Sequence, residues 1–101
     1  MKKIIAGKKY DTETAKEVGY WSNNYSYSDF SYCEEKLFRK RNGEYFLYGS
    51  GGAMTIYAEC CCDGRCGGSN IIPMTVDEAK QWAEEHIDVD EYEAEFGEVE
   101  E

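Results

Sequence analysis

The dipeptide Asn42-Gly43 most strongly constrains how this chain can fold, because strand-forming residues flank it on both sides. Asn-Gly is the favoured sequence for the two-residue type I′ turn of a β-hairpin. The pattern predicts an antiparallel hairpin with three cross-strand pairs: Arg41 with Glu44, Arg39 with Phe46, and Leu37 with Tyr48. In this register Phe38 and Leu47 share the other face and enter the core.

Further strands are expected in three segments, residues 2–10, 53–59 and 70–74. The first contains a glycine turn, and the last belongs at a sheet edge because Pro73 cannot donate a hydrogen bond to a ladder. Residues 11–18 predict a short helix that begins at Asp11 or Thr12 and ends at Gly19.

Two amphipathic helices are expected near the C-terminus. Thr75 and Glu78 form a capping box at the start of the first helix. Its apolar stripe consists of Val76, Ala79, Trp82, Ala83 and Ile87. Asp88 and Glu91 form a second capping pair, and Gly97 can close the helix that follows. The predicted fold is α+β: a small antiparallel sheet of three to five strands, a short N-terminal helix, and one or two C-terminal amphipathic helices. Residues 1–97 form one domain, and residues 98–101 are an acidic tail.

The net charge of −10 is concentrated in the last quarter of the chain. Residues 77–101 contain twelve acidic residues and one lysine, whereas residues 1–76 contain nine acidic and ten basic residues. Carboxylates one helical turn apart stand about 5–6 Å apart, which is similar to the phosphate spacing along a nucleic-acid strand. We predict a partner-binding surface that imitates phosphate and includes Asp77, Glu84, Glu85, Glu91 and Glu95. The alternative is a solvated face that keeps the protein soluble.

Residues 20–32 consist mainly of Tyr, Trp, Phe, Ser and Asn and show no sustained helical period. Antibody paratopes have this composition, because rigid aromatic rings supply contact area at low entropic cost. Tyr25 and Tyr27 are therefore candidate partner-binding residues. The alternative is that the aromatic residues of this segment cap the small core.

Four of the five cysteines lie between Glu59 and Cys66, in the segment ECCCDGRC. Zinc sites usually take two closely spaced ligands from each of two segments. Besides Cys60, Cys61, Cys62 and Cys66, the only zinc ligands elsewhere in the chain would be Cys33 and His86. A reduced, solvent-facing loop with no metal is the favoured interpretation, and a zinc-stabilised module is the alternative. No histidine lies near these thiols, and His86 is expected to be a half-buried packing residue. We therefore expect neither a cofactor nor enzymatic activity.

No segment has the roughly 18 consecutive apolar residues of a membrane span, and the N-terminus lacks the apolar run of a signal peptide. These features predict a cytoplasmic protein with no membrane partner. The net negative charge opposes direct binding to nucleic acid. Against this, Lys36, Arg39, Lys40 and Arg41 could contact phosphate while Phe46 or Tyr48 stacks on bases.

Three segments, GKKYDTETAKEVG, CEEKLFRKRNGEYFLYGSGGAM and IIPMTVDEAKQWAEEH, resemble a family of short proteins from phages, plasmids and conjugative elements of Gram-positive bacteria. The resemblance covers most of residues 4–96. Mobile elements of this kind encode inhibitors of host defence, including anti-CRISPR proteins, so the resemblance implies an inhibitor of that class. It supplies no catalytic residues. The family has a polar Ser/Asn/Gly loop in place of Cys60–Cys66, which implies a variable surface loop there.

The leading prediction is a non-enzymatic protein that binds and inhibits a host nucleic-acid-handling enzyme, such as a CRISPR effector nuclease. One rival is a small nucleic-acid-binding accessory protein that uses the basic hairpin and the tyrosine-rich loop. Another is a zinc-stabilised interaction module.

Overall fold

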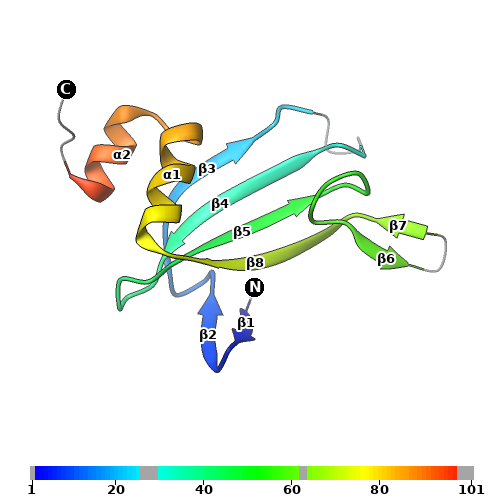
Figure 1. Cartoon of the computed structure of the whole chain (residues 1–101), viewed down its shortest axis with the longest axis horizontal. Coiled ribbons are helices and arrows are strands. Elements are labelled where there is room, and N and C mark those ends of the chain that lie inside the picture. The colour runs from blue at the N-terminus through cyan, green and yellow to red at the C-terminus, as the bar shows by residue number, and fades with distance from the viewer. Residues whose placement is uncertain (1, 26–29, 62–63, 98–101) are drawn as a thin grey trace.

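The computed structural model describes residues 2–25, 30–61 and 64–97, and a four-stranded antiparallel sheet lies at its centre (Figure 1). In spatial order the sheet consists of β3 (Lys16–Ser22), β4 (Cys33–Arg39), β5 (Tyr45–Gly51) and β8 (Gly68–Met74). Two smaller pairs are β1 (Lys2–Ile5) with β2 (Lys8–Asp11), and β6 (Glu59–Cys61) with β7 (Gly64–Cys66). The helices are α1 (Val76–His86) and α2 (Val89–Phe96). The predicted α+β class, a sheet within the expected size, and two C-terminal helices are confirmed.

The hairpin of β4 and β5 differs from the predicted register by one residue. The Lys40 N–H donates to the Glu44 carbonyl at 2.7 Å, and the Gly43 N–H donates to the Lys40 carbonyl at 2.9 Å. The loop therefore contains three residues, with Gly43 in the left-handed region at a φ of 92°. Leu37 pairs with Leu47, and Phe38 pairs with Phe46. The predicted two-residue turn is wrong, and the slip changes which side chains share a face.

One face of the sheet packs against the helices. Its buried cluster joins three sheet residues to three helix residues: Leu37, Tyr45, Leu47, Ala79, Trp82 and Ala83. The glycine at position 19 allows the close approach of α1 to β3. A Cβ at Gly19 would lie 2.6 Å from Cγ2 of Ile87. This face therefore fixes the position of both helices at one end of the sheet (Figure 1).

The opposite face is partly covered by the hairpin of β1 and β2. Tyr10 of β2 belongs to a second buried cluster with Phe38, Phe46 and Ile71. The Tyr10 and Phe46 rings meet edge to face at 5.5 Å, while Phe38 and Phe46 stack at 5.3 Å. The hairpin leaves the end of the sheet nearest β6 and β7 uncovered (Figure 1).

The helix predicted at residues 11–18 is absent. The Asp11 carboxylate accepts the Glu13 N–H at 2.9 Å, and the Ala15 N–H bonds the Asp11 carbonyl at 3.2 Å. These bonds close one turn, after which the chain enters β3 at Lys16. Pairing with β4 along β3, interrupted by a register shift at Val18, outweighs the local helical pattern.

The strand predicted at residues 53–59 is also wrong over most of its length, since residues 53–57 form turns and only Glu59 belongs to β6. The turns place Tyr57 in the core, where its hydroxyl donates a hydrogen bond to the buried Glu35 carboxylate. Nε1 of Trp82 donates to the other oxygen of Glu35 at 3.0 Å. The Tyr57 ring occupies the space where a side chain at Gly49 would lie. A single carboxylate thus joins this loop, the sheet and α1.

The C-terminal elements follow their local signals. The Thr75 hydroxyl accepts the Glu78 N–H at 3.2 Å, and Glu78 Oε1 accepts the Thr75 N–H at 2.9 Å, which completes the predicted capping box. Asp88 caps α2, and Gly97 ends it at a φ of 91°. β8, which contains Pro73, lies at the sheet edge as expected. No helix within the described ranges is long and apolar enough to cross a membrane.

Replacing Tyr57 with Phe should lower the free energy of unfolding by about 1.5–3 kcal/mol, because the buried Glu35 carboxylate loses a hydrogen-bond donor. Urea denaturation measures the change. Tyr25→Phe is the matched control, since Tyr25 is exposed and should change stability by less than about 0.5 kcal/mol. Equal effects of the two substitutions would contradict the structural role of the Glu35 bonds.

Candidate functional site

Exposed carboxylates gather on the two C-terminal helices. We call the residues Asp77, Glu84, Glu85, Asp90 and Glu91 the acidic helical surface, and all five are exposed. Among the ion pairs of the described residues, only Glu85 contributes from this set, at 3.8 Å from Nε2 of the neighbouring His86. Four of the five predicted acidic residues, Asp77, Glu84, Glu85 and Glu91, are thus exposed on the two helices, and their role in binding stays a prediction.

A small apolar notch lies between α1 and α2, beside the acidic helical surface. Its cavity of about 370 Å³ has a mainly apolar lining that includes Ala83, Ile87, Val89 and Tyr92. The carboxyl-bearing residues Glu84, Asp88 and Glu93 complete the lining. Val89 is 70% exposed. The notch could accept an apolar or long aliphatic side chain whose surroundings are basic.

Glu95 does not belong to the acidic helical surface, contrary to expectation. Its side chain is only 3% exposed, and its carboxylate lies 2.6 Å from Nη1 of Arg39 and 3.9 Å from Nζ of Lys16. The Tyr45 hydroxyl donates to it at 2.7 Å. Burial, together with this hydrogen bond, raises the pKa of Tyr45 to about 12. Glu95 therefore fastens α2 to the sheet.

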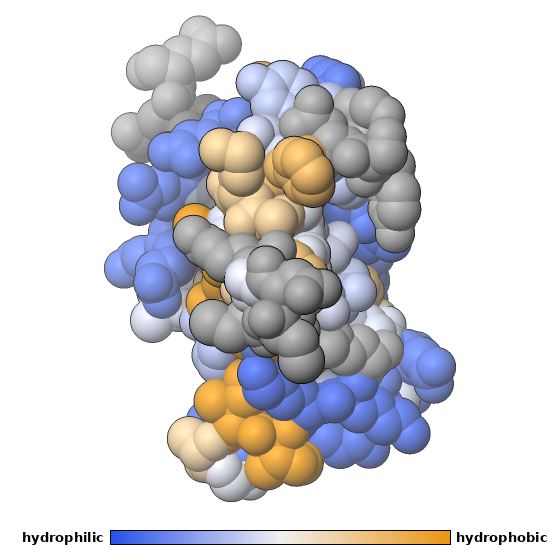
Figure 2. All heavy atoms as spheres, turned by 90° about the vertical axis from the view of Figure 1, so that its right-hand side faces the viewer, coloured by the Kyte–Doolittle hydropathy of each residue, from blue (hydrophilic) through white to orange (hydrophobic). Residues whose placement is uncertain are grey.

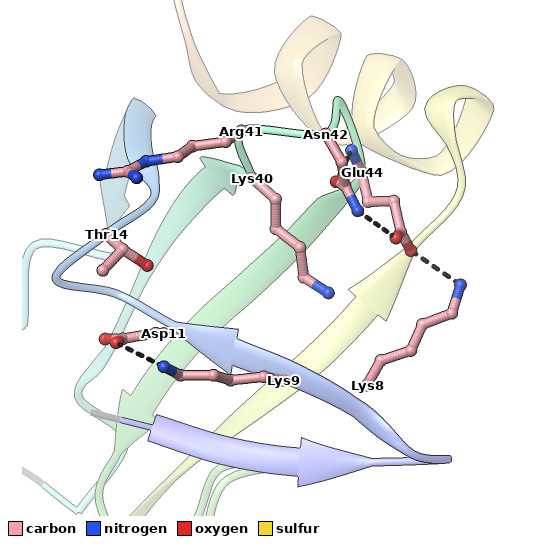
Figure 3. A pocket seen from close by; sticks show the side chains of 8 residues that line it. All are labelled: Lys8, Lys9, Asp11, Thr14, Lys40, Arg41, Asn42 and Glu44. Atoms are coloured by element: carbon pink, nitrogen blue, oxygen red, sulfur yellow. Dashed lines mark hydrogen bonds and ion pairs between the residues drawn. The ribbon is translucent and has the colours of Figure 1, made fainter.

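Several cations meet in an open pocket formed by two hairpins (Figure 3). Lys8 and Lys9 come from β2, whereas Lys40 and Arg41 come from the β4–β5 loop. The cavity measures about 510 Å³. Arg39 does not line this pocket; it bonds Glu95 and lines a second cavity together with Lys40 and Arg41.

Two carboxylates of this basic pocket and the nearby Tyr10 ring already engage three of its four cations. Nζ of Lys8 lies 3.1 Å from Oε2 of Glu44, and Nζ of Lys9 lies 3.9 Å from Oδ2 of Asp11. The hydrogen bond between Lys8 and Glu44 raises the pKa of Lys8 and lowers the pKa of Glu44. Nζ of Lys40 lies 3.6 Å from the centre of the Tyr10 ring. The sequence analysis did not identify the two lysines of β2 as part of a cationic site, although they are adjacent within a predicted strand.

The described parts of the tyrosine-rich segment, residues 20–25 and 30–32, adjoin the uncovered end of the sheet (Figure 1). Tyr25 is 54% exposed, whereas Tyr27 lies outside the described residues. Asn23 supports the segment, because its Nδ2 donates to the Ser31 carbonyl at 2.7 Å and its Oδ1 accepts the Cys33 N–H at 3.2 Å. Trp21 instead packs against the core, which agrees with the alternative for that residue.

The cysteine-rich segment forms the short β6–β7 ladder rather than a simple loop, with position 60 paired to position 65. Cys62 lies outside the described residues. Among the side chains that the structure describes, which exclude those of residues 59–63 and 65, no three His, Cys, Asp or Glu groups are placed to hold a metal. Burial raises the pKa of the Cys33 thiol, which disfavours its reactive thiolate. His86 lies between the rings of Trp21 and Trp82, as expected of a packing residue.

Replacing Glu95 with Gln should lower the free energy of unfolding by about 1–3 kcal/mol, since the buried carboxylate bonds Arg39 and Tyr45. Replacing Glu84 with Gln should change it by less than about 0.5 kcal/mol, because this side chain is exposed. Urea denaturation of the two variants compares them at equal charge. If Glu84→Gln proves as costly as Glu95→Gln, the assignment of structural and surface carboxylates is wrong.

We compared the chain with models of protein families, with curated proteins and with solved structures, and none of them matches it. Support for a function therefore has to come from the geometry and charge of the chain's own surface.

Proposed function

We propose that the chain is a non-enzymatic binding protein that docks its acidic helical surface onto a basic surface of a partner protein. The observation that supports this most directly is the apolar notch beside exposed carboxylates that lack strong counter-ions. A purely solubilising face would not require an apolar recess next to its charges. The notch and the carboxylates together suit a partner that presents an apolar side chain among lysines and arginines.

The two parts of this surface would contribute differently to binding. Unneutralised carboxylates attract a basic partner over a distance of about 8–10 Å at moderate salt and mainly raise the association rate. Filling the notch removes apolar area from water and slows dissociation. The complex should therefore form more slowly as salt is added, while the dissociation rate changes less.

The class of partner follows from the resemblance to mobile-element proteins together with the charge pattern. A host defence enzyme that handles nucleic acid must present a basic channel to phosphates. The carboxylates of the acidic helical surface could occupy such a channel, and inhibition in the host cytoplasm would follow. A CRISPR effector nuclease is the partner we propose.

Replacing Glu84 and Glu91 with Gln should abolish inhibition while leaving the thermal midpoint unchanged. The test measures DNA cleavage by purified CRISPR effector nucleases from Gram-positive hosts, with increasing amounts of the protein. Glu13→Gln with Glu17→Gln is the matched control, because it removes equal charge from exposed sites outside the helices. The control should inhibit as the original chain does. Undiminished inhibition by the Glu84/Glu91 variant, or no inhibition of any nuclease tested, would overturn the proposal.

Direct binding of nucleic acid is a second candidate function, favoured by the meeting of Lys8 and Lys9 with Lys40 and Arg41. The net charge of −10 opposes it, and so do the acidic partners of both β2 lysines. We expect the opposing effects to dominate.

Fluorescence anisotropy with labelled single- and double-stranded DNA should accordingly show no binding at micromolar protein and moderate salt. Tight, salt-sensitive binding would instead establish the second candidate. This binding would have to disappear in the double variant Lys40→Gln/Arg41→Gln. It would have to persist in the charge-matched double variant Lys2→Gln/Lys80→Gln. Neither control residue lines the basic pocket.

A further inference from the structure

The face of the sheet opposite the helices carries a partly buried carboxylate, that of Glu34 in β4. Three hydroxyl groups from different segments donate hydrogen bonds to it. The Tyr32 hydroxyl lies 2.7 Å from Oε2, the Tyr20 hydroxyl lies 3.1 Å from the same oxygen, and the Ser50 hydroxyl lies 3.2 Å from Oε1. The sheet therefore brings together residues of β3, β4 and β5 around a single carboxylate.

The charge of Lys36 lowers the pKa of Glu34, but no cation of the described residues forms an ion pair with this carboxylate. The hydrogen bond from Tyr32, followed by those from Tyr20 and Ser50, holds the pKa of Glu34 below its usual range despite partial burial. None of the ion pairs in the described part of the chain includes Glu34. The neighbouring Lys36 instead lies 3.8 Å from Oε1 of Glu17. Glu34 thus presents a fixed, ionised acceptor.

This carboxylate belongs to an open cavity of about 500 Å³ at the uncovered end of the sheet. Tyr32 and Tyr48 contribute aromatic walls, while Ser50 and Ser69 contribute hydroxyl groups. The remaining lining consists of glycines: Gly51, Gly52, Gly67 and Gly68. A Cβ at Gly67 would lie 2.8 Å from the Gly51 carbonyl oxygen, so the backbones approach closely here. With so few side chains, peptide groups are within reach of a ligand.

The two backbone segments that lead away from this cavity carry exposed apolar side chains. The Gly52 N–H donates to the Tyr32 carbonyl. Two residues further from the cavity on each segment, the Met54 N–H donates to the Phe30 carbonyl at 2.8 Å. Phe30 is 68% exposed, and Met54 is 73% exposed. Figure 2, which faces this end of the molecule, shows apolar atoms at the surface among hydrophilic ones. A ligand with one cationic group and an adjoining apolar group would match both features.

We propose that the Glu34 cavity binds the guanidinium group of an arginine side chain from a partner protein, with an apolar neighbour of that arginine resting on Phe30 and Met54. A guanidinium can bond a carboxylate oxygen through its planar fork and at the same time stack on tyrosine rings. The ionised Glu34 repels anionic ligands. The cavity lies on the opposite face from the acidic helical surface, so this inference does not depend on the proposed function.

NMR titration of the isotope-labelled protein with a small probe tests the inference. The probe is acetyl-arginyl-phenylalanine amide, and its control contains citrulline, the neutral isostere of arginine. The arginine probe should cause saturable shifts of the backbone amides of Gly51, Gly52, Gly67 and Gly68. The citrulline probe should bind about tenfold more weakly, because a charge-assisted bond becomes a neutral one.

Glu34→Gln should reduce the affinity for the arginine probe to the level of the citrulline probe, whereas Glu13→Gln, at an exposed site that does not line the cavity, should leave this affinity unchanged. The comparison of the two probes on the unaltered protein keeps the test valid even if Glu34→Gln fails to fold. Equal affinity for both probes, or shifts confined to α1 and α2, would overturn the inference. Loss of nuclease inhibition would not affect it.

Discussion

The hydrogen bonds that Tyr57 and Trp82 donate to Glu35 are the interaction on which the rest of this structure depends. Burying a carboxylate without hydrogen-bond donors would cost several kcal/mol. The fold must therefore place donors beside Glu35. Trp82 brings α1 onto the sheet, and Tyr57 folds the segment after β5 back against Gly49. The apolar notch and the Glu34 cavity lie in regions positioned by these two contacts.

The two faces of the sheet have different chemistry because successive strand residues point to opposite sides. On β4, Glu35 faces the helices and is enclosed, while Glu34 faces the opposite side and remains accessible to solvent. The same residue type thus stabilises the core at one position and offers a ligand acceptor at the next. The helices add a second acidic surface on their own side, so each face carries a separate attraction for cations.

Local sequence signals predicted the two C-terminal helices better than the rest of the chain. The caps at Thr75 and Asp88 act within one turn, so the helices could be located without tertiary information. The short helix at residues 11–18 failed because pairing with β4 is a long-range effect. Helical spacing identified carboxylates that are exposed on both helices but could not reveal that Glu95 bonds Arg39. The cavity at Glu34 had no sequence signal, since its residues come from separate strands.

The ends of β5 and β8 are adjacent, because position 51 pairs with position 68. The intervening residues therefore leave the sheet and return to it at nearly the same point. Beyond Tyr57, this excursion contains the β6–β7 ladder, which has its own backbone pairing. The entropic cost of closing a loop grows only slowly with its length. The β6–β7 ladder is thus a natural insertion point, where the chain can gain or lose residues during evolution without shifting the register of the sheet.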